Sequence, residues 1–222
     1  MLKKIDRGRQ FLAENHQLFR CPVCQEEVKK SDNGLICKNN HRFDLSKKGT
    51  LYFLSHAVKT EYDQGMFVPR RRMIQSGMYQ PVIETIAQHL PEEVSLLDVG
   101  CGEGSFLNEL SKLKKIQNAV GFDISKEGVY AATEQSAEAF WCVADLTNLP
   151  FAEAMKLTER QRVTYEFEIP EENQKDLLAM SPLEWQVEER IKADLYKNPL
   201  KKITIDIELL KGTKRKRFSS SF

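Results

Sequence analysis

The segment from Leu96 to Gly104 constrains the fold of this chain more than any other. It reads Leu-Leu-Asp-Val-Gly-Cys-Gly-Glu-Gly, an apolar run that ends in an acid and then a turn with glycine at every second position. Gly100, Gly102 and Gly104 allow a tight turn and leave room for a ligand beside the backbone. The segment therefore predicts a strand that delivers its end to a nucleotide-like cofactor.

Apolar strands and amphipathic helices alternate after this point. Strands are expected at 94–99, 119–124 and 140–144, and helices at 105–113 and 126–135. This βαβαβ order predicts a parallel sheet with right-handed crossovers. The alternation stops beyond Pro150, where two half-exposed strands at 162–169 and 203–210 flank expected helices at 172–180 and 182–197.

A cluster of cysteines lies upstream of this α/β pattern. Cys21, Cys24, Cys37 and His41 have the spacing C-x2-C-x12-C-x3-H. Two turns can bring four such ligands into a tetrahedron, which suits a closed structural zinc site with no open position for catalysis. The alternative is a set of reduced cysteines beside a histidine that has other partners. Clustered cysteines in a chain without an export signal favour the metal.

Three acids follow three successive strands of the expected sheet, namely Asp98, Asp123 and Asp145. The spacing Asp98-x-Gly100-x-Gly102-x-Gly104 differs from the G-x-G-x-x-G of nicotinamide and flavin enzymes. An acid before the turn suits the amino group of S-adenosylmethionine, Asp123 the ribose hydroxyls and Asp145 the adenine amino group. The alternative for each acid is a helix N-cap.

Charge is distributed unevenly along the chain. Residues 1–80 hold 15 Lys and Arg against 8 Asp and Glu, a net charge of +7 within a chain whose total is +1. A basic N-terminal part suits a polyanion such as RNA, with Arg70, Arg71, Arg72, Lys47 and Lys48 as candidate phosphate contacts. The alternative is a solvated basic surface. No apolar run is long enough to span a membrane, and no signal peptide is evident, which favours the cytoplasm.

Together, these motifs resemble those of the bacterial 23S rRNA (guanine-N1) methyltransferases. The resemblance is carried by Cys21-Pro-Val-Cys24, His41-Arg-Phe-Asp44, Gly77-x-Tyr79-x-Pro81 and Leu97-Asp-Val-Gly-Cys-Gly-Glu-Gly104. It implies a class I (Rossmann-like) methyltransferase fold behind an N-terminal zinc module. It further implies methyl transfer from S-adenosylmethionine to guanine N1 of 23S rRNA, a zinc module that helps to recognise an rRNA hairpin, and a homodimer.

The resemblance divides the chain into three parts. We expect a zinc-binding module with its lead-in at 1–60, a basic linker and helix at 61–92, and a methyltransferase-like domain at 93–222. By match of motif, the cofactor contacts are Asp98, Gly100, Gly102, Gly104, Asp123 and Asp145, and the metal ligands are Cys21, Cys24, Cys37 and His41. No catalytic residue can be assigned.

The chain departs from the family after Leu149-Pro150-Phe151. In such domains this stretch leads into a fourth strand, a helix, a fifth strand and another helix, whereas here it runs directly into the final hairpin. About 60 residues of the pattern are absent, judged by the length of two strand–helix units. The hairpin must then pair beside the first strand, or that edge of the sheet stays open.

Two functions follow from this gap. The first is an rRNA guanine-N1 methyltransferase whose cofactor binding and activity are impaired by the absent segment. The second is a non-catalytic, zinc-containing RNA-binding protein that keeps a vestigial cofactor fold. A small-molecule methyltransferase is weaker, because it leaves the basic zinc module without a role.

Overall fold

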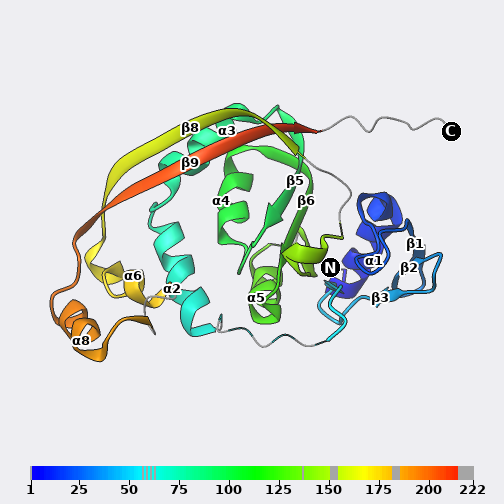
Figure 1. The fold of residues 1–222 in the computed structure, drawn as a ribbon, viewed down its shortest axis with the longest axis horizontal. Coiled ribbons are helices and arrows are strands. Elements are labelled where there is room, and N and C mark those ends of the chain that lie inside the picture. Colours follow the sequence, from blue (N-terminus) through cyan, green and yellow to red (C-terminus); the bar gives the residue numbers. More distant parts are fainter. Residues whose placement is uncertain are drawn as a thin grey trace.

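The computed structural model describes residues 2–214 except 57, 59, 61, 63, 137, 151–154 and 182–185 (Figure 1). The described strands form a three-stranded sheet near the N-terminus, a four-stranded sheet in the centre and a two-stranded hairpin that arches over one side. Of the segments named above, Phe151 and the first four residues of the helix expected at 182–197 lie outside the described residues.

The central sheet is parallel and has the strand order β4-β7-β6-β5. Its strands are β4 (Leu51–Tyr52), β5 (Glu93–Val99), β6 (Lys115–Asp123) and β7 (Phe140–Val143). Helix α4 (Ser105–Leu113) joins β5 to β6, and helix α5 (Lys126–Gln135) joins β6 to β7. The predicted βαβαβ unit and its parallel sheet are therefore confirmed.

The two faces of this sheet are buried against different partners. Alternate residues of a strand point to opposite faces, so Val120, Phe122 and Phe140 on one face share a core with the N-terminal residues Leu12 and Phe19. On the other face, Trp141 and Val143 pack with Leu107 of α4 and with Val129 of α5. The sheet therefore carries helices on one side and the N-terminal module on the other.

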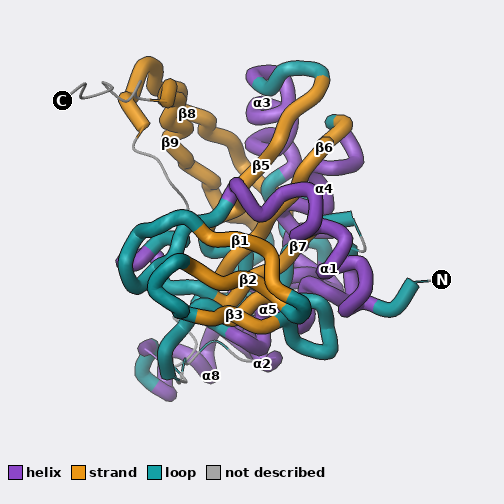
Figure 2. The backbone as a smooth tube through the Cα atoms, turned by 90° about the vertical axis from the view of Figure 1, so that its right-hand side faces the viewer, coloured by secondary structure: helices purple, strands orange, loops and turns teal. Residues whose placement is uncertain are grey.

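The N-terminal module consists of one helix and a small antiparallel sheet (Figure 2). Helix α1 (Lys4–Asn15) runs into the short 3-10 helix η1 (His16–Leu18). The sheet contains β1 (Val28–Ser31), β2 (Gly34–Cys37) and β3 (Arg42–Asp44). Gly34 is needed at the start of β2, because a Cβ atom there would overlap the backbone oxygen of Phe43.

The first part of the basic linker and helix expected at 61–92 is not an extended linker, because it contains helix α2 (Gln64–Gln75). Met66, Phe67, Met73 and Ile74 are buried at spacings of one, six and one residues, which places them on one helical face. Their burial outweighs Pro69, which lies inside the helix. Helix α3 (Gln80–His89) follows and ends before Pro91, within the helix expected in 61–92.

The C-terminal part is a long hairpin of β8 (Met155–Glu168) and β9 (Lys202–Lys214). β8 begins seven residues before the strand predicted at 162–169 and ends one residue before its end, and β9 extends the strand predicted at 203–210 at both ends. Between them lie the 3-10 helix η3 (Glu171–Asn173), a short helix α6 (Asp176–Ala179) and helix α8 (Glu189–Lys197). The hairpin buries Ile169 and Ile205 against Met73 and Met78.

The outer edge of β5 stays open within the described part of the chain. β6 is the only described strand that pairs with β5, and the hairpin pairs only with itself. Of the two outcomes expected from the absent strands, the open edge is the one observed. Leu97, inside β5, is 42% exposed, and Val99, at its end, is 47% exposed.

The boundary predicted at residue 60, between the zinc-binding module and the linker, stays a prediction. The structure does show how the module is joined to the central sheet. Strand β4, which lies before residue 60, belongs to the central sheet beside β7. Among the described helices, none is long and apolar enough to cross a membrane.

Candidate functional site

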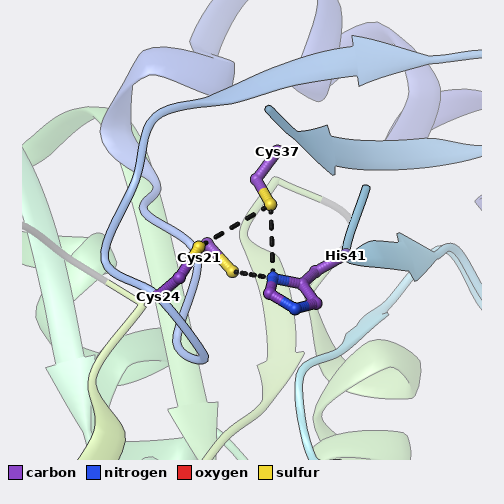
Figure 3. A group of neighbouring side chains, drawn as sticks. All are labelled: Cys21, Cys24, Cys37 and His41. Atoms are coloured by element: carbon purple, nitrogen blue, oxygen red, sulfur yellow. Dashed lines mark hydrogen bonds between the residues drawn. The ribbon is translucent and has the colours of Figure 1, made fainter. Parts of the chain in front are cut away.

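Four potential metal ligands meet at the N-terminal module (Figure 3). Cys21 and Cys24 lie on the turn before β1, Cys37 ends β2, and His41 precedes β3. The thiol sulfurs and an imidazole nitrogen all lie within 4.8 Å of one another. The structure thus brings together all four residues that the sequence predicted.

The spacings between these atoms fit a tetrahedral zinc site. The Sγ atoms of Cys24 and Cys37 are 3.8 Å apart, and His41 Nδ1 lies 3.4 Å from the Sγ atoms of both Cys21 and Cys37. With Zn–S near 2.3 Å and Zn–N near 2.0–2.1 Å, a regular tetrahedron has S–S edges of about 3.8 Å and S–N edges of about 3.5 Å. The donor set therefore matches zinc in both type and size.

The thiols of this cluster differ in their environments. Burial raises the pKa of Cys21 to about 11, whereas the hydrogen bond from the backbone N–H of Glu26 helps to lower the pKa of Cys24 to about 6. A bound cation favours the thiolate form of every ligand. Cys24 is thus closer to the thiolate form than Cys21.

A second site lies at the carboxyl ends of the parallel strands, where α/β proteins bind their ligands. A cavity of about 390 Å³ opens there. Its walls come from the ends of β5, β6 and β7, and from α2 and the residues before it. The lining residues are Tyr62, Met66, Phe67, Arg70, Val99, Gly100, Phe122, Asp123, Ile124, Ala144, Asp145 and Leu146.

The three glycines of the turn have different surroundings. All have positive φ angles, of +75° at Gly100, +54° at Gly102 and +80° at Gly104. Gly100 lines the cavity, and a Cβ atom there would meet nothing within 4 Å. Gly102 instead faces Arg70 and Phe67 of α2, and Gly104 faces Trp141. Gly100 is therefore the glycine whose open side a ligand can approach.

Asp123 stands in the wall of the cavity and also holds the glycine turn. Its Oδ2 atom accepts a hydrogen bond from the backbone N–H of Gly102 at 2.9 Å, and Oδ1 accepts one from Ser125 at 2.8 Å. Ser125, not Asp123, caps helix α5 by accepting a hydrogen bond from the N–H of Gly128. The carboxylate of Asp123 thus connects β6 to the turn after β5.

Asp145 caps the 3-10 helix η2 (Leu146–Asn148), the alternative role considered for the acids at the strand ends. Oδ1 accepts hydrogen bonds from both the backbone N–H and the hydroxyl of Thr147 at 2.8 Å, and these bonds lower the pKa of the carboxyl group. Because both of these hydrogen bonds go to Oδ1 and Asp145 also lines the cavity, its capping role does not exclude contact with a ligand.

Asp98 differs from the other two acids because it is not among the described residues that line the cavity. Burial raises its pKa to about 6; Arg70 opposes this shift, whereas Asp123 and Glu103 add to it. Its Oδ2 atom is buried and has no hydrogen-bond partner among the described groups. A cationic group beside Asp98 would relieve this unfavourable burial.

The sequence did not identify two charged residues at this site. Glu103 of the glycine turn is fully buried, and Arg70 of α2 reaches it with Nη1 3.7 Å from Oε2. Arg70 was predicted as a phosphate contact together with Arg71 and Arg72. Arg72 is engaged elsewhere, in an ion pair with Asp176. The apolar spacing along 66–74 is the signal that would have shown which arginine faces the sheet.

Comparison with known proteins follows the same division of the chain. Residues 19–58 match the family model of the RlmA N-terminal zinc ribbon, and residues 96–178 match a methyltransferase domain. A relative in Bacillus subtilis (strain 168), provisionally named 23S rRNA (guanine-N(1)-)-methyltransferase YxjB, is 37% identical over 146 residues. That alignment covers 60% of this chain and 52% of the relative.

The 23S rRNA (guanine(748)-N(1))-methyltransferase of Streptomyces fradiae is 30% identical over 58% of this chain and 48% of that protein. The chain is a homologue of these rRNA methyltransferases. It consists of an RlmA-type zinc ribbon and a methyltransferase-type α/β sheet, and the predicted fold class is thereby confirmed.

The chain spans about half the length of the curated relatives that it matches. Among solved structures, a complex of the Haloferax volcanii Trm112 methyltransferase activator with a provisionally assigned methyltransferase gives a TM-score of 0.36. Sequence identity is 24%, over 43% of this chain and 44% of that one.

Proposed function

We propose that this chain binds S-adenosylmethionine in the cavity at the carboxyl ends of β5, β6 and β7, and that it methylates guanine N1 in 23S rRNA. The observation that carries the proposal is the position of Asp123, Asp145 and Gly100 around one cavity, where the chemistry of a nucleoside needs acceptors and an open backbone. The two rRNA methyltransferase relatives support the choice of substrate.

The residues of the cavity fit the different parts of this cofactor. Asp123 is placed to accept the ribose hydroxyls, and Asp145 to accept the adenine amino group. Apolar walls from Met66, Phe122 and Ile124 would cover the flat base. When bound, S-adenosylmethionine supplies an electrophilic methyl group. The role of the protein is then to position the guanine against that group.

We further propose that Cys21, Cys24, Cys37 and His41 hold a structural zinc ion. The donor spacings carry this assignment, and four protein ligands leave no position open for chemistry. The ribbon and the basic residues near it would then contact the rRNA. The location in the cytoplasm and the homodimer stay predictions.

The open edge of β5 bears on the rate of the reaction. Guanine N1 must lose a proton, so an acceptor has to lie near the base. The described acids at the cavity are Asp123 and Asp145, which the cofactor would occupy. The absent strands would have lain beside β5 and formed one wall of the pocket for the guanine. We therefore propose a slow enzyme, whose transfer rate is limited by poor positioning of the base.

The test is methyl transfer from tritiated S-adenosylmethionine to 23S rRNA that lacks the modification, followed by primer extension, which stops at N1-methylguanine. The expected result is incorporation at a single guanine. Asp123→Asn should abolish it, whereas Glu172→Gln, at an exposed position of η3 outside the ribbon and the cavity, should leave it unchanged. Salt-sensitive rRNA binding without incorporation would overturn the proposal and favour a non-catalytic RNA-binding protein.

A further inference from the structure

We infer that Arg70 binds the methionine carboxylate of the cofactor, so that this arginine of helix α2 makes the site selective for the amino-acid end of S-adenosylmethionine. The inference rests on the proposed cofactor site and adds to it a residue outside the strand-end motifs. It also reassigns Arg70 from an rRNA phosphate contact to a cofactor contact.

Among the described residues that line the cavity, Arg70 is the one with a cationic side chain. Its side chain lies over the glycine turn and is 26% exposed, so the guanidinium is largely shielded from water but reachable from the cavity. The approach depends on Gly102, because a Cβ atom at that position would overlap Arg70 Nη1. The turn thus gives Arg70 access to the cavity wall beside Val99 and Gly100.

The guanidinium has capacity to bind a second carboxylate. Its ion pair with Glu103 spans 3.7 Å between Nη1 and Oε2, which is longer than a hydrogen bond. Neither carboxylate oxygen of Glu103 has a hydrogen-bond partner among the described groups, although the side chain is fully buried. Arginine offers five N–H donors in a planar fork that matches a carboxylate in two contacts. Glu103 therefore fixes the charge of Arg70 in place and leaves most of its donors for a ligand.

The amino group of the same ligand has a matching acceptor. The buried Oδ2 atom of Asp98 lacks a partner among the described groups, and Asp98 feels the charge of Arg70. An α-amino acid carries an ammonium and a carboxylate on one carbon atom. Asp98 and Arg70 carry the two opposite charges that such a group requires, and they are near enough for the charge of Arg70 to act on Asp98.

The experiment is calorimetric titration of the full chain with two probes, S-adenosylhomocysteine and 5′-methylthioadenosine. The first contains the amino-acid end and the second lacks it, while both contain the nucleoside. Arg70→Met should weaken binding of S-adenosylhomocysteine at least tenfold and change binding of 5′-methylthioadenosine less than twofold. Arg70→Lys should recover part of the loss, because it restores the charge but not the fork.

Arg71→Met is the matched control, since Arg71 lies on the same helix but not in the cavity wall, and it should bind both probes like the unaltered chain. Equal loss of both probes in Arg70→Met, or no loss of either, would overturn the inference. Failure of the unaltered chain to bind either probe would instead overturn the proposed cofactor site. Thermal melting of each variant identifies any that does not fold.

Discussion

Leu51 pairs with Cys142 in parallel register, so the chain that leaves the zinc ribbon becomes the outer strand of the methyltransferase sheet. Both residues are fully buried, and they share one core with Phe43 of the ribbon and Phe140 of the sheet. The ribbon is therefore not an independently packed domain. A change that unfolds the ribbon also exposes one face of the sheet to water.

Removal of the metal should accordingly destabilise the whole protein. We expect a chelator, or Cys24→Ser, to lower the melting temperature by about 10 °C or more in a single transition, since a structural zinc contributes several kcal/mol to folding. Circular dichroism reports the loss of the sheet together with the ribbon. Zinc content, measured by mass spectrometry, should fall from one ion per chain.

Cys101→Ser is the control for this experiment, because Cys101 is buried beside the sheet and lies outside the ligand cluster. It should retain one zinc ion. Two well-separated transitions, with the sheet unaffected by the chelator, would contradict the view that ribbon and sheet fold as one unit.

The sequence predicted the elements whose own periodicity decides their structure. Helices at 105–113 and 126–135 have the predicted bounds, because each follows a buried strand and carries its apolar residues on one face. The four metal ligands could also be predicted from the sequence, because their spacing along two turns sets the geometry of the metal site directly.

Other features depend on tertiary contacts and could not be predicted from the sequence. Gly65 and Pro69 disfavour a helix locally, but α2 is stabilised because Phe67 packs near Gly102 and Gly128 and Met73 packs against the hairpin. The ion pair of Glu103 could not be predicted for the same reason. Arg70 lies 33 positions earlier in the sequence, and only the packing of α2 brings the two residues together. The role of β4 in the central sheet likewise rests on a pairing with β7 that is distant in sequence.

Cofactor affinity should depend on pH through Asp98. With a pKa of about 6, the carboxyl group is ionised at pH 8 and mostly protonated at pH 5. Arg70 faces it from α2, Asp123 from β6 and Glu103 from the turn. We expect S-adenosylhomocysteine to bind several-fold more weakly at pH 5 than at pH 8, because the ammonium loses its anionic partner. In Asp98→Asn this dependence should be absent, and a dependence that persists would assign it to another group.

The same carboxyl should cost stability when no ligand is bound. Its folded pKa lies above the ordinary value of 3.8, so its favourable contribution is present below pH 4 and is lost as the pH rises through 6. A rise of the pKa from 3.8 to about 6 corresponds to about 3 kcal/mol. Asp98→Asn should therefore raise the melting temperature at pH 8 while it weakens binding. An unchanged or lower melting temperature at pH 8 would contradict this account.

Arg72 should stabilise the contact between α2 and α6. It donates hydrogen bonds from Nε to Asp176 Oδ2 at 2.7 Å and from Nη2 to Oδ1 at 2.5 Å, and Asn173 donates a further one to Oδ2. Asp176 is buried, so Arg72→Met leaves a buried carboxylate without its cation. We expect a loss of about 2 kcal/mol in the free energy of unfolding, since Arg72 is half exposed and the pair is partly screened.

Arg162→Met is the comparison for this change. Arg162 pairs with Asp206 across the hairpin, but both side chains are exposed, and removal of an exposed pair has little effect. Urea unfolding of the two variants should separate them. Equal and small losses would show that the carboxylate of Asp176 gains water when Arg72 is removed.

Because the edge of β5 is open, we expect truncation of an apolar side chain in this strand to cost little stability. Leu107 of α4 is 3% exposed, and Leu107→Ala should cost about 3 kcal/mol through lost burial and the cavity left behind. Leu97 lies in the middle of β5 but is 42% exposed, so Leu97→Ala should cost about 1 kcal/mol or less. Urea unfolding at low protein concentration measures both. A cost at Leu97 as large as that at Leu107 would show that this face is covered in solution, and a doubled mass by light scattering, lost in Leu97→Ala, would identify a second copy of the chain as the cover.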